Sequence, residues 1–434
     1  MSKPRVVITG IGAVSPLGFN KDQIWESLLE RKISLVKESY PAAEGKWQDV
    51  WSHRVKKFDI NKFGLDKDEL DYIKQWKGGK DSKILNYLLA AVKVALDDSG
   101  IVYDKKDNNI GSFLTVEHPD FDSFCEELIC DIAEKIESKK LIPEKEALLE
   151  HMYRANEKKG YDLHTFMHLY FVNKMFGFHG YSLFVNNACA SGLYVLEAAA
   201  RQIRGGHSQI ALVAAGDEGG SIYKFRWFKD RGLYAADGLI KPFSREADGL
   251  VVGEGASVMV LEDYEHARRR GAFIYAGYLG GGFSCEGWKV IYPNVSEKNY
   301  HNCITQALAA SGLSYKDIDL INPHGVGMKI TDLYEARAVN DIFSASKKCR
   351  LSALKPYMGH NLGGSAVIES IVVILMLNHG MILPALNCNE PIKEIDQFLA
   401  TDYIDKDINI AMKTSCGFAG YNAAAIFKKT ACES

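Results

Sequence analysis

The segment YSLFVNNACASGLYVLEAAARQIRGG, residues 181–206, determines how the rest of the chain is interpreted. It begins with a short apolar run at 181–185 and then passes through two asparagines and an alanine to Cys189. After the cysteine, apolar residues recur at helical spacing until the Gly205-Gly206 pair ends the pattern. The segment therefore predicts a strand, a sharp turn that carries the cysteine, and a buried helix.

The place of Cys189 before a helix favours reactivity. Unpaired N–H groups and the dipole at a helix N-terminus both favour an anion, so we expect this thiol to lose its proton easily and to act as a nucleophile. Small residues at 188 and 190–192 leave room for a substrate. A buried structural cysteine is the alternative, because that is the commoner fate of a free cysteine. This segment alone does not decide between the two.

The composition indicates a globular chain with a large core. Of its 434 residues, 47% are hydrophobic and 25% are charged, and the length fits two domains or one large duplicated domain. A formal net charge of −3 gives no electrostatic case for nucleic-acid binding. The best apolar run, 371–377, is far shorter than the roughly 18–20 residues of a membrane span. No signal-peptide cleavage site is evident near the N-terminus, so we expect a cytoplasmic protein without a membrane segment.

Metal sites are not favoured by the pattern of ligand residues. Nine cysteines are scattered without a paired framework, which predicts reduced thiols, and the spacing of Cys125 and Cys130 is only a weak metal signal. His164, His168 and His179 lie close in sequence, but no carboxylate pattern accompanies them. We therefore favour packing in a core or pocket for these histidines, and we expect no zinc or other metal.

Strand and helix patterns alternate along the chain, as in a layered α/β sheet with helices on both faces. The pattern fills 1–265 and restarts over 266–434, so we predict two similar α/β halves in tandem. A Glu- and Lys-rich segment at about 117–160 reads as an inserted helical hairpin that mostly faces solvent, with partner docking as the alternative. Gly10 and Gly12 lack the third glycine of a dinucleotide-binding fingerprint, which favours a simple strand and glycine-rich turn.

Two histidines end predicted strands of the second half. His324 lies in the tetrapeptide NPHG, and His360 lies in MGHNLGG. Glycine beside each histidine lets backbone and substrate approach closely, and strand ends are where α/β sheets place their sites. A lone histidine is usually structural, but two in matching positions, together with Cys189, favour catalysis.

With these residues the sequence resembles the elongating β-ketoacyl-acyl-carrier-protein synthases of the thiolase superfamily, over nearly the whole chain. Several separated motifs carry the resemblance in the family's order. They are NACASG at 187–192, KPFSREADG at 241–249, GEG at 253–255, HG at 324–325 with Asp332 and Glu335, the segment 352–364 with Lys355 and His360, and CGFAG at 416–420. The resemblance implies a thiolase-like fold, with two pseudo-duplicated α/β halves in α-β-α-β-α layers.

The same resemblance implies a decarboxylative Claisen condensation. In that reaction Cys189 attacks an acyl thioester and holds the acyl group. His324 and His360 then polarise the carbonyl of malonyl-acyl-carrier-protein and stabilise the enolate that decarboxylation leaves, and this enolate attacks the acyl-cysteine. The backbone N–H groups of Cys189 and Phe418 form the other oxyanion hole, and Phe418 also resembles a gate to the acyl pocket.

Four further residues take supporting roles by resemblance. Lys355 and Glu369 form a buried ion pair behind the second histidine, where they orient rather than react. Asp332 and Glu335 follow the first histidine as supporting residues. No cofactor is implied, because the substrates are carried on the phosphopantetheine of an acyl carrier protein.

Two departures from the family pattern point away from housekeeping fatty-acid synthesis. Val326 and Met328 stand where the family usually has threonine or serine residues that contact the pantetheine arm. The segment 117–160 is longer and more charged than the family's usual segment there. The spacing Gly325-x-Gly327-x-Lys329-x-x-Asp332 resembles the ketosynthase subunit of type II polyketide systems.

Three functions stay open at this point. They are condensation in a type II polyketide or specialised fatty-acid pathway, the same activity in ordinary fatty-acid synthesis, and a non-elongating chain-length or acyltransferase-type partner subunit. Cys189 with both histidines disfavours the third, and also disfavours a Cys-His hydrolase of unrelated fold.

We expect a homodimer, or a heterodimer with a ketosynthase-like chain-length subunit. An acidic carrier protein is expected to dock on basic residues near the entrance of the site. The candidates are Lys74, Lys77, Lys80, Arg201 and Arg204.

Overall fold

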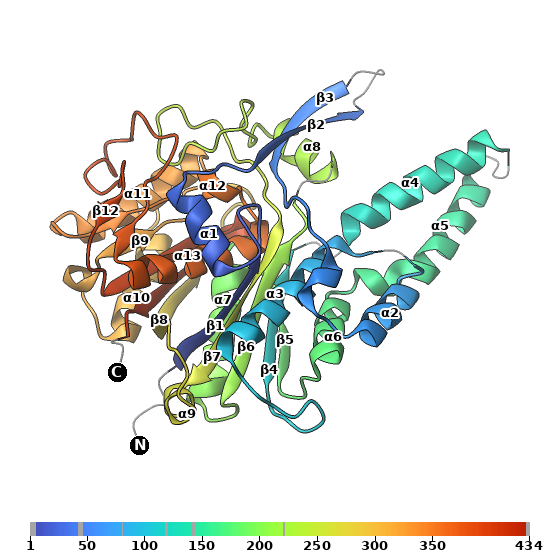
Figure 1. Cartoon of the computed structure of the whole chain (residues 1–434). Helices are drawn as coiled ribbons and strands as arrows, with labels where there is room; N and C mark the ends of the chain where they lie inside the picture. The colour runs from blue at the N-terminus through green and yellow to red at the C-terminus, as the bar shows by residue number, and fades with distance from the viewer. Residues whose placement is uncertain are drawn as a thin grey trace.

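The computed structural model describes residues 6–41, 47–79, 81–117, 120–139, 144–219 and 222–430. Its centre is a ten-stranded mixed sheet that consists of two five-stranded halves (Figure 1). The first half contains β1 (Val6–Val14), β4 (Gly111–Val116), β5 (Ser182–Phe184), β6 (Ile210–Asp217) and β7 (Gly255–Asp263). The second contains β8 (Ala276–Cys285), β9 (Leu320–Asn322), β10 (Arg350–Leu351), β13 (Ile410–Cys416) and β14 (Tyr421–Lys428). Two small hairpins lie outside this sheet: β2 (Leu35–Pro41) with β3 (Trp47–His53), and β11 (Met381–Ile382) with β12 (Ile404–Asp405).

The two halves repeat one topology. The strand order is β1-β7-β6-β4-β5 in the first half and β8-β14-β13-β9-β10 in the second. In each half the first two pairings are antiparallel and the last two are parallel. An antiparallel contact between β1 and β8 joins the halves. The predicted pseudo-duplicated α/β fold is confirmed. The boundary at 265/266 falls inside helix α9 (Tyr264–Arg269) and stays a prediction.

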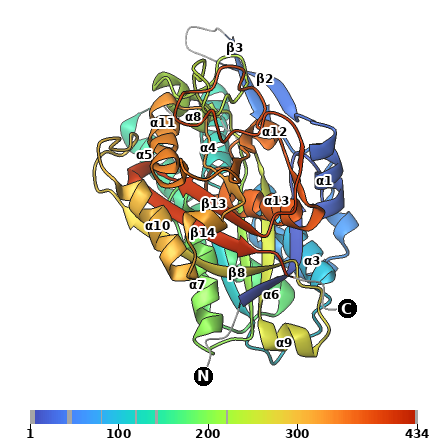
Figure 2. The same ribbon diagram turned by 90° about the vertical axis from the view of Figure 1, so that its left-hand side faces the viewer.

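Helices cover both outer faces and fill the space between the two halves of the sheet (Figures 1 and 2). Helices α3 (Lys83–Ser99) and α6 (Thr165–Phe176) pack on the first half, and α10 (Asn299–Ser311) and α11 (Lys329–Phe343) pack on the second. Helices α7 (Ser191–Arg204) and α13 (Ser365–His379) lie between them. The order of layers is therefore α-β-α-β-α, as the resemblance implies. The remaining helices are α1 (Lys21–Leu29), α2 (Lys67–Trp76), α4 (Phe121–Glu137), α5 (Lys145–Lys159), α8 (Ile222–Asp230) and α12 (Lys355–Met358).

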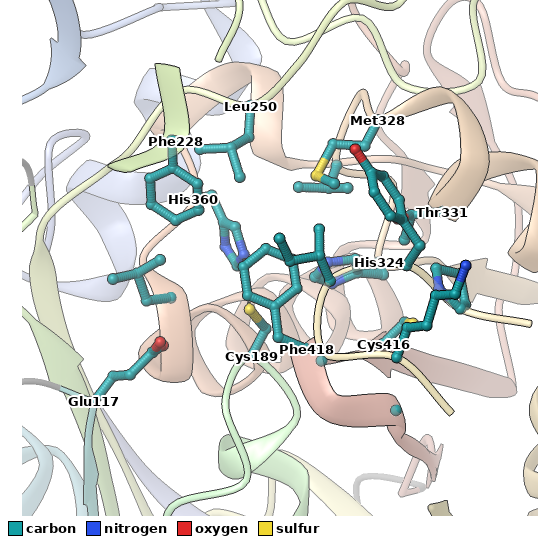
Figure 3. Close-up of a pocket in the computed structure, with 18 residues that line it drawn as sticks. Glu117, Cys189, Phe228, Leu250, His324, Met328, Thr331, His360, Cys416 and Phe418 are labelled. Carbon is teal, nitrogen blue, oxygen red and sulfur yellow. Dashed lines mark hydrogen bonds between the residues drawn. The ribbon is translucent and has the colours of Figure 1, made fainter. Parts of the chain in front are cut away.

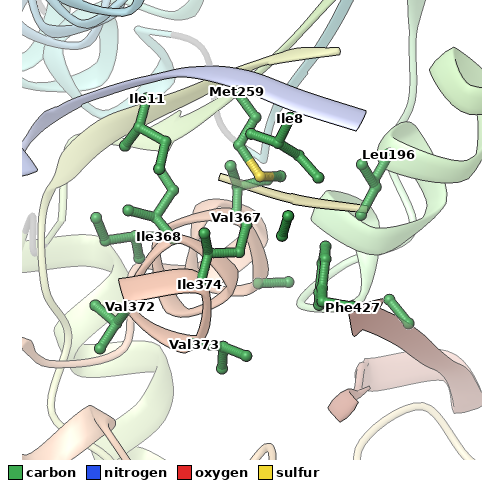
Figure 4. Close-up of a cluster of buried hydrophobic side chains, with 14 of the residues drawn as sticks. Ile8, Ile11, Leu196, Met259, Val367, Ile368, Val372, Val373, Ile374 and Phe427 are labelled. Atoms are coloured by element: carbon green, nitrogen blue, oxygen red, sulfur yellow. The ribbon is translucent and has the colours of Figure 1, made fainter. Parts of the chain in front are cut away.

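Helix α13 is the centre of the core. Its residues from Ser365 to Leu377 are all buried, and its apolar side chains meet β1, β7 and β14 (Figure 4). The stretch Leu362–His379 is long and apolar enough to cross a membrane by length and composition, but 89% of it is buried inside the protein. The sequence-based statement concerned uninterrupted apolar runs, and it holds, since Ser365, Glu369 and Ser370 interrupt this stretch. Its contacts are those of an interior helix.

The paired glycines near the N-terminus serve packing. Gly10 and Gly12 lie inside β1, under helix α3. A Cβ on Gly12 would stand 2.1 Å from the carbonyl oxygen of Ala91, and one on Gly10 would stand 2.5 Å from that of Ala95. Only glycine lets the helix lie this close to the strand. The strand and turn predicted over 5–18 are present: β1 continues to Val14, and the turn follows at 15–18, where Ser15 and Gly18 exchange backbone hydrogen bonds.

The charged segment after β4 contains α4 and α5, which lie side by side and project away from the sheet (Figure 1). A contact of 2.6 Å between the His151 ring and the Asp131 carboxylate links the two helices. Several of their apolar side chains are exposed, among them Ile129, Leu149 and Tyr153.

Candidate active site

Cys189 lies on a tight turn between β5 and α7. Ala188 has a φ of 50°, in the left-handed region that a non-glycine residue seldom adopts, so the chain reverses sharply just before the cysteine. The hydroxyl of Ser191 accepts a hydrogen bond from Asn187 N at 2.6 Å and donates one to Ala188 O at 2.5 Å. Ser415 Oγ donates to Cys189 O at 2.9 Å. The predicted strand, turn and helix are thus present, and local hydrogen bonds hold the turn.

His324 lies on the loop that follows β9, and two carboxylates from α11 hold this loop. Glu335 accepts hydrogen bonds from His324 N and Gly325 N, each at 2.8 Å. Asp332 accepts from the N–H groups of Val326 at 3.1 Å and Gly327 at 3.2 Å. Asp332 also accepts from Phe243 N at 2.7 Å. The two supporting acidic residues therefore act on the backbone of the histidine loop.

His360 brings the second imidazole to the cysteine. Its Nε2 lies 3.2 Å from Cys189 Sγ (Figure 3). Its Nδ1 lies 2.8 Å from Ser365 Oγ. The His324 ring stands beside it, with 5.2 Å between ring centroids and 80° between planes. A hydroxyl can accept from or donate to Nδ1, so Ser365 supports either tautomer of His360. The three groups singled out in the sequence share one buried pocket.

A buried cluster of charges lies behind the His324 loop. Lys355 Nζ is 2.8 Å from Glu369 Oε1 and donates to the carbonyl oxygen of His324 at 2.6 Å. The predicted ion pair is present; its hydrogen bond goes to the backbone of the first histidine, and the Lys355 charge acts on both rings. Lys413, which sequence reasoning missed, forms an ion pair with the other oxygen of Glu369 and donates to Pro323 O at 3.0 Å.

Burial determines the resting protonation of the site. It lowers the pKa of both imidazoles well below the ordinary value, and the Lys355 ammonium lowers each pKa further. Both rings are therefore neutral. Burial raises the pKa of the Cys189 thiol, and Glu117 adds to this increase. The expectation of an easily ionised thiol is wrong, because the N–H groups that face the sulfur do not outweigh burial.

The pocket around Cys189 has an apolar wall. Val326 and Met328, the predicted residues of the pantetheine channel, both line it and are 1% and 6% exposed. Phe418 lies beside the cysteine, with ring centroids 5.7 Å from Trp227 and 6.3 Å from Phe228 (Figure 3). Other lining residues that sequence reasoning missed are Leu250, Ile291, Tyr292, Pro293, Thr331, Leu362 and Cys416.

The loop of Phe418 approaches the nucleophile closely. A Cβ on Gly417 would stand 3.2 Å from Cys189 N and 3.0 Å from Asn187 O, so a side chain here would crowd the turn of the nucleophile. The backbone N–H groups of Phe418 and Cys189 both face the sulfur, where they act to lower its pKa. They are thus placed where an oxyanion beside the cysteine would form.

Glu117 is a carboxylic acid in the pocket that sequence reasoning missed. It follows β4 directly, lines the pocket and is half-buried (Figure 3). Burial raises the pKa of its carboxyl group to about 7, and the Asp217 carboxylate adds to the increase. We had placed Glu117 at the start of the solvent-facing insertion. Its position at the carboxyl end of a buried strand was the available signal.

The predicted docking cations are mostly misplaced. Lys77 is buried in an ion pair with Asp120 at 2.7 Å, so it cannot serve as an exposed docking residue. Arg201 and Arg204 lie in the last turn of α7, whereas Cys189 precedes its first turn, and a helix of this length separates them by about 20 Å. Both arginines pair with Glu197. Lys74 is exposed on α2, and Lys80 lies outside the described residues. Lys289, at the pocket, was missed.

The residues weighed for metal binding lie apart. His168 is fully buried with its Nε2 3.6 Å from Asp120, His164 stacks on Phe166, and His179 Nε2 bonds to Lys105 O. Within the described part of the chain, no group of three or more His, Cys, Asp or Glu could hold a metal ion. The eight cysteines in that part are free thiols, and Cys432 lies outside it.

Comparison with known proteins agrees with this geometry. The family described as "Beta-ketoacyl synthase, N-terminal domain" matches residues 3–267, and "Beta-ketoacyl synthase, C-terminal domain" matches 275–389. The chain is 28% identical to 3-oxoacyl-[acyl-carrier-protein] synthase 2 of Vibrio harveyi, across 99% of this chain and 100% of that protein. It is 32% identical to chloroplastic 3-oxoacyl-[acyl-carrier-protein] synthase I of Hordeum vulgare, over 58% of this chain and 56% of that protein.

A solved structure shows the same architecture. The structure titled "The ishigamide ketosynthase/chain length factor" superposes with a TM-score of 0.84 at 25% identity, and the match covers 99% of this chain and 100% of that one. The thiolase-like fold implied by the sequence motifs is thereby confirmed. The chain belongs to the β-ketoacyl synthase family, and it is an enzyme of the acyltransferase class.

Proposed function

We propose that this enzyme joins an acyl group held on Cys189 to a two-carbon unit from a malonyl thioester, with loss of carbon dioxide, to give a β-ketoacyl thioester. The observation that supports this most strongly is the 3.2 Å contact between His360 Nε2 and Cys189 Sγ, with the His324 ring beside it in one buried pocket. A cysteine hydrolase needs one histidine and an orienting Asn or Asp. The paired neutral imidazoles fit a site that decarboxylates as well.

Acyl transfer uses the contact between the thiol and His360. Sγ attacks the carbonyl carbon of an acyl thioester while His360 Nε2 accepts the thiol proton. The bond to the departing thiol then breaks, and that thiol takes up the proton. The N–H groups of Cys189 and Phe418, which face the sulfur, donate to the oxyanion of the tetrahedral intermediate.

Condensation uses both rings, with His360 in its Nε2–H tautomer, in which Ser365 Oγ donates to Nδ1. A malonyl thioester places its carbonyl oxygen near His324 and His360, whose N–H groups donate to the negative charge that forms there as carbon dioxide leaves. The resulting carbanion attacks the acyl carbonyl on Cys189, and the C–S bond breaks to return the sulfur. Because burial keeps both imidazoles neutral, they can donate without an imidazolium charge in the pocket.

We assign the enzyme to a type II polyketide or specialised fatty-acid pathway. Support comes from the likeness to a ketosynthase/chain length factor and from the apolar Val326 and Met328 in the pocket. The substrates arrive on the phosphopantetheine of an acyl carrier protein, no further cofactor takes part, and the reaction takes place in the cytoplasm. The working unit is a homodimer or a heterodimer with a chain-length subunit.

Housekeeping elongation is the second candidate, favoured by the full-length match to the Vibrio synthase.

Mass spectrometry of the enzyme after incubation with acyl-carrier thioesters tests the function and names the acyl group. We expect the acyl mass on the peptide that contains Cys189.

In Cys189→Ala the loading should vanish while decarboxylation of the malonyl thioester continues; loss of both with the fold intact would contradict the assigned roles. His324→Ala should suppress decarboxylation but spare most loading, because the ring in contact with Sγ is His360. Common saturated acyl groups of every length on Cys189 would favour housekeeping elongation.

A further inference from the structure

Lys413 stands in a part of the core where a charged side chain is costly. It lies in the middle of β13, it is fully buried, and its neighbours along that strand are buried too. Burying an ammonium group is unfavourable unless partners compensate for the lost hydration. The compensating groups are Glu369, with which Lys413 forms an ion pair, and the carbonyl oxygen of Pro323 at 3.0 Å. Pro323 directly precedes His324, so Lys413 holds the loop that carries the catalytic ring.

Glu369 already has a cation without Lys413. Lys355 Nζ lies 2.8 Å from its other oxygen and also binds the backbone of His324. A second buried carboxylate, Glu335, lies close by and accepts hydrogen bonds from His324 N, Gly325 N and Thr414 Oγ1. The two carboxylates that act on Lys413, Glu369 and Glu335, would share one lysine without it, which would leave one of these two negative charges uncompensated. Lys413 is the second cation that balances this charge.

We propose that Lys413 is a positioning residue for decarboxylation: it neutralises the buried carboxylates behind the His324 loop, so that negative charge can form on the malonyl thioester in front of it. This inference rests on the proposed condensing function. Lys413 does not touch the substrate in this scheme; it acts through the electrostatic potential at the two rings and through the Pro323 carbonyl.

The protonation of Lys413 should then be visible in the rate. Burial and the Lys355 charge lower its pKa, Glu369 and Glu335 act in the opposite direction, and the net result is a pKa of about 8. The decarboxylation rate should therefore fall as the pH rises. Below pH 8 the Lys413 ammonium is present and the charges of Glu369 and Glu335 are balanced, whereas above pH 8 this positive charge is lost and one carboxylate is uncompensated. The titratable groups that face Lys413 from the neighbouring elements are Glu369, Lys355, Glu335, His324 and His360.

The test measures decarboxylation of malonyl-carrier thioester from pH 6.5 to 9.5 in a Cys189→Ala background, which removes the titration of the thiol. With Lys413 present, the rate should fall roughly 10-fold with a midpoint near pH 8, as expected for one buried charge acting from behind the site. Lys413→Met should lack the fall centred near pH 8 and be roughly 10-fold slower at pH 7, and any change near pH 7 from Glu117 and Asp332 should be the same with and without Lys413. Lys413→Arg should move the falling limb beyond the measured range, since a guanidinium keeps its charge.

Lys428→Met is the matched control, because it removes an exposed lysine from the adjacent strand β14 and should leave the profile as it was. Lys413→Met leaves Glu369 paired with Lys355, so we expect it to fold; if it does not, Lys413→Arg decides the question alone. An unchanged falling limb in Lys413→Arg, or an unchanged rate in Lys413→Met, would overturn the inference. No decarboxylation by Cys189→Ala at any pH would instead refute the proposed function.

Discussion

Replacing Glu335 by alanine should separate the two half-reactions of this enzyme. Glu335 is fully buried, and its carboxylate accepts hydrogen bonds from His324 N and Gly325 N at 2.8 Å, from Thr414 Oγ1 at 3.0 Å and from the Tyr300 hydroxyl. The first two donors are backbone groups of the histidine loop. The alanine variant removes all four acceptor contacts while it leaves Cys189 and His360 in place.

The magnitude follows from the donors that lose their partner. The two hydroxyls can rotate toward other acceptors, but two buried N–H groups cannot, and each unsatisfied group costs about 1–3 kcal/mol. We therefore expect the free energy of unfolding to fall by about 2–6 kcal/mol. A displacement of the His324 ring by about 1 Å would lower decarboxylation on the order of 100-fold. Acyl loading should change much less, because Cys189 is held by the Ser191 and Ser415 hydroxyls.

The assay follows both half-reactions on the same protein. Loading is read from the mass added to Cys189, decarboxylation from released carbon dioxide, and stability from urea unfolding. Asp341→Ala is the control, since it removes an exposed carboxylate from the same helix, α11. An equal loss of loading and decarboxylation would show that Glu335 supports the whole pocket, and would refute its specific role on the His324 loop.

Three further expectations concern the pocket. Glu117→Gln removes a charge that raises the pKa of Cys189, so alkylation of Cys189 by iodoacetamide at pH 8 should be about 3- to 10-fold faster, and the two proteins should converge below pH 6; equal rates at pH 8 would contradict this. Phe418→Ala removes a ring packed between the cysteine and two aromatic neighbours, so longer acyl groups should load at measurable rates; an unchanged acyl range by mass spectrometry would count against a gate. Burial raises the pKa of Asp332 to about 7, so the folded protein keeps a proton that the unfolded chain loses near pH 4, and this group makes the free energy of unfolding fall from about pH 4 to pH 7. Asp332→Asn should flatten that slope in urea unfolding, and an unchanged slope would assign it to other groups.

The sequence predicted the parts of this site that depend on local chemistry. A strand, a turn of small residues and an amphipathic helix are encoded side by side around Cys189, and the structure has all three. His324 and His360 were found because each follows a strand and stands beside glycine. The family motifs then gave Asp332 and Glu335, whose contacts with the His324 loop are short-range, since α11 begins five residues after the histidine.

Other features depend on packing between distant segments, which no local pattern records. Lys413 reads in sequence as an ordinary lysine between Met412 and Thr414, and only the fold brings it to Glu369. Lys77 reads as a surface lysine near Trp76, but the fold buries it against Asp120. The pKa of Cys189 was predicted in the wrong direction for the same reason. The helix N-terminus is visible in sequence, whereas the depth of the pocket and the nearby Glu117 are not.

The duplicated topology explains why these distant groups meet. Strands β4 and β9 hold equivalent places in the two halves, as do β5 and β10. Glu117 follows β4, and His324 follows β9 within two residues, so the carboxyl and the imidazole occupy related positions on either side of the site. Cys189 follows β5, and His360 follows β10 by way of the short helix α12. Each half therefore contributes the same two strand ends, and the chemistry differs only in the side chains placed there. Because α4 and α5 lie between β4 and β5, this segment can lengthen outward without moving either strand end, which is how a charged insertion and an intact catalytic centre coexist in one half.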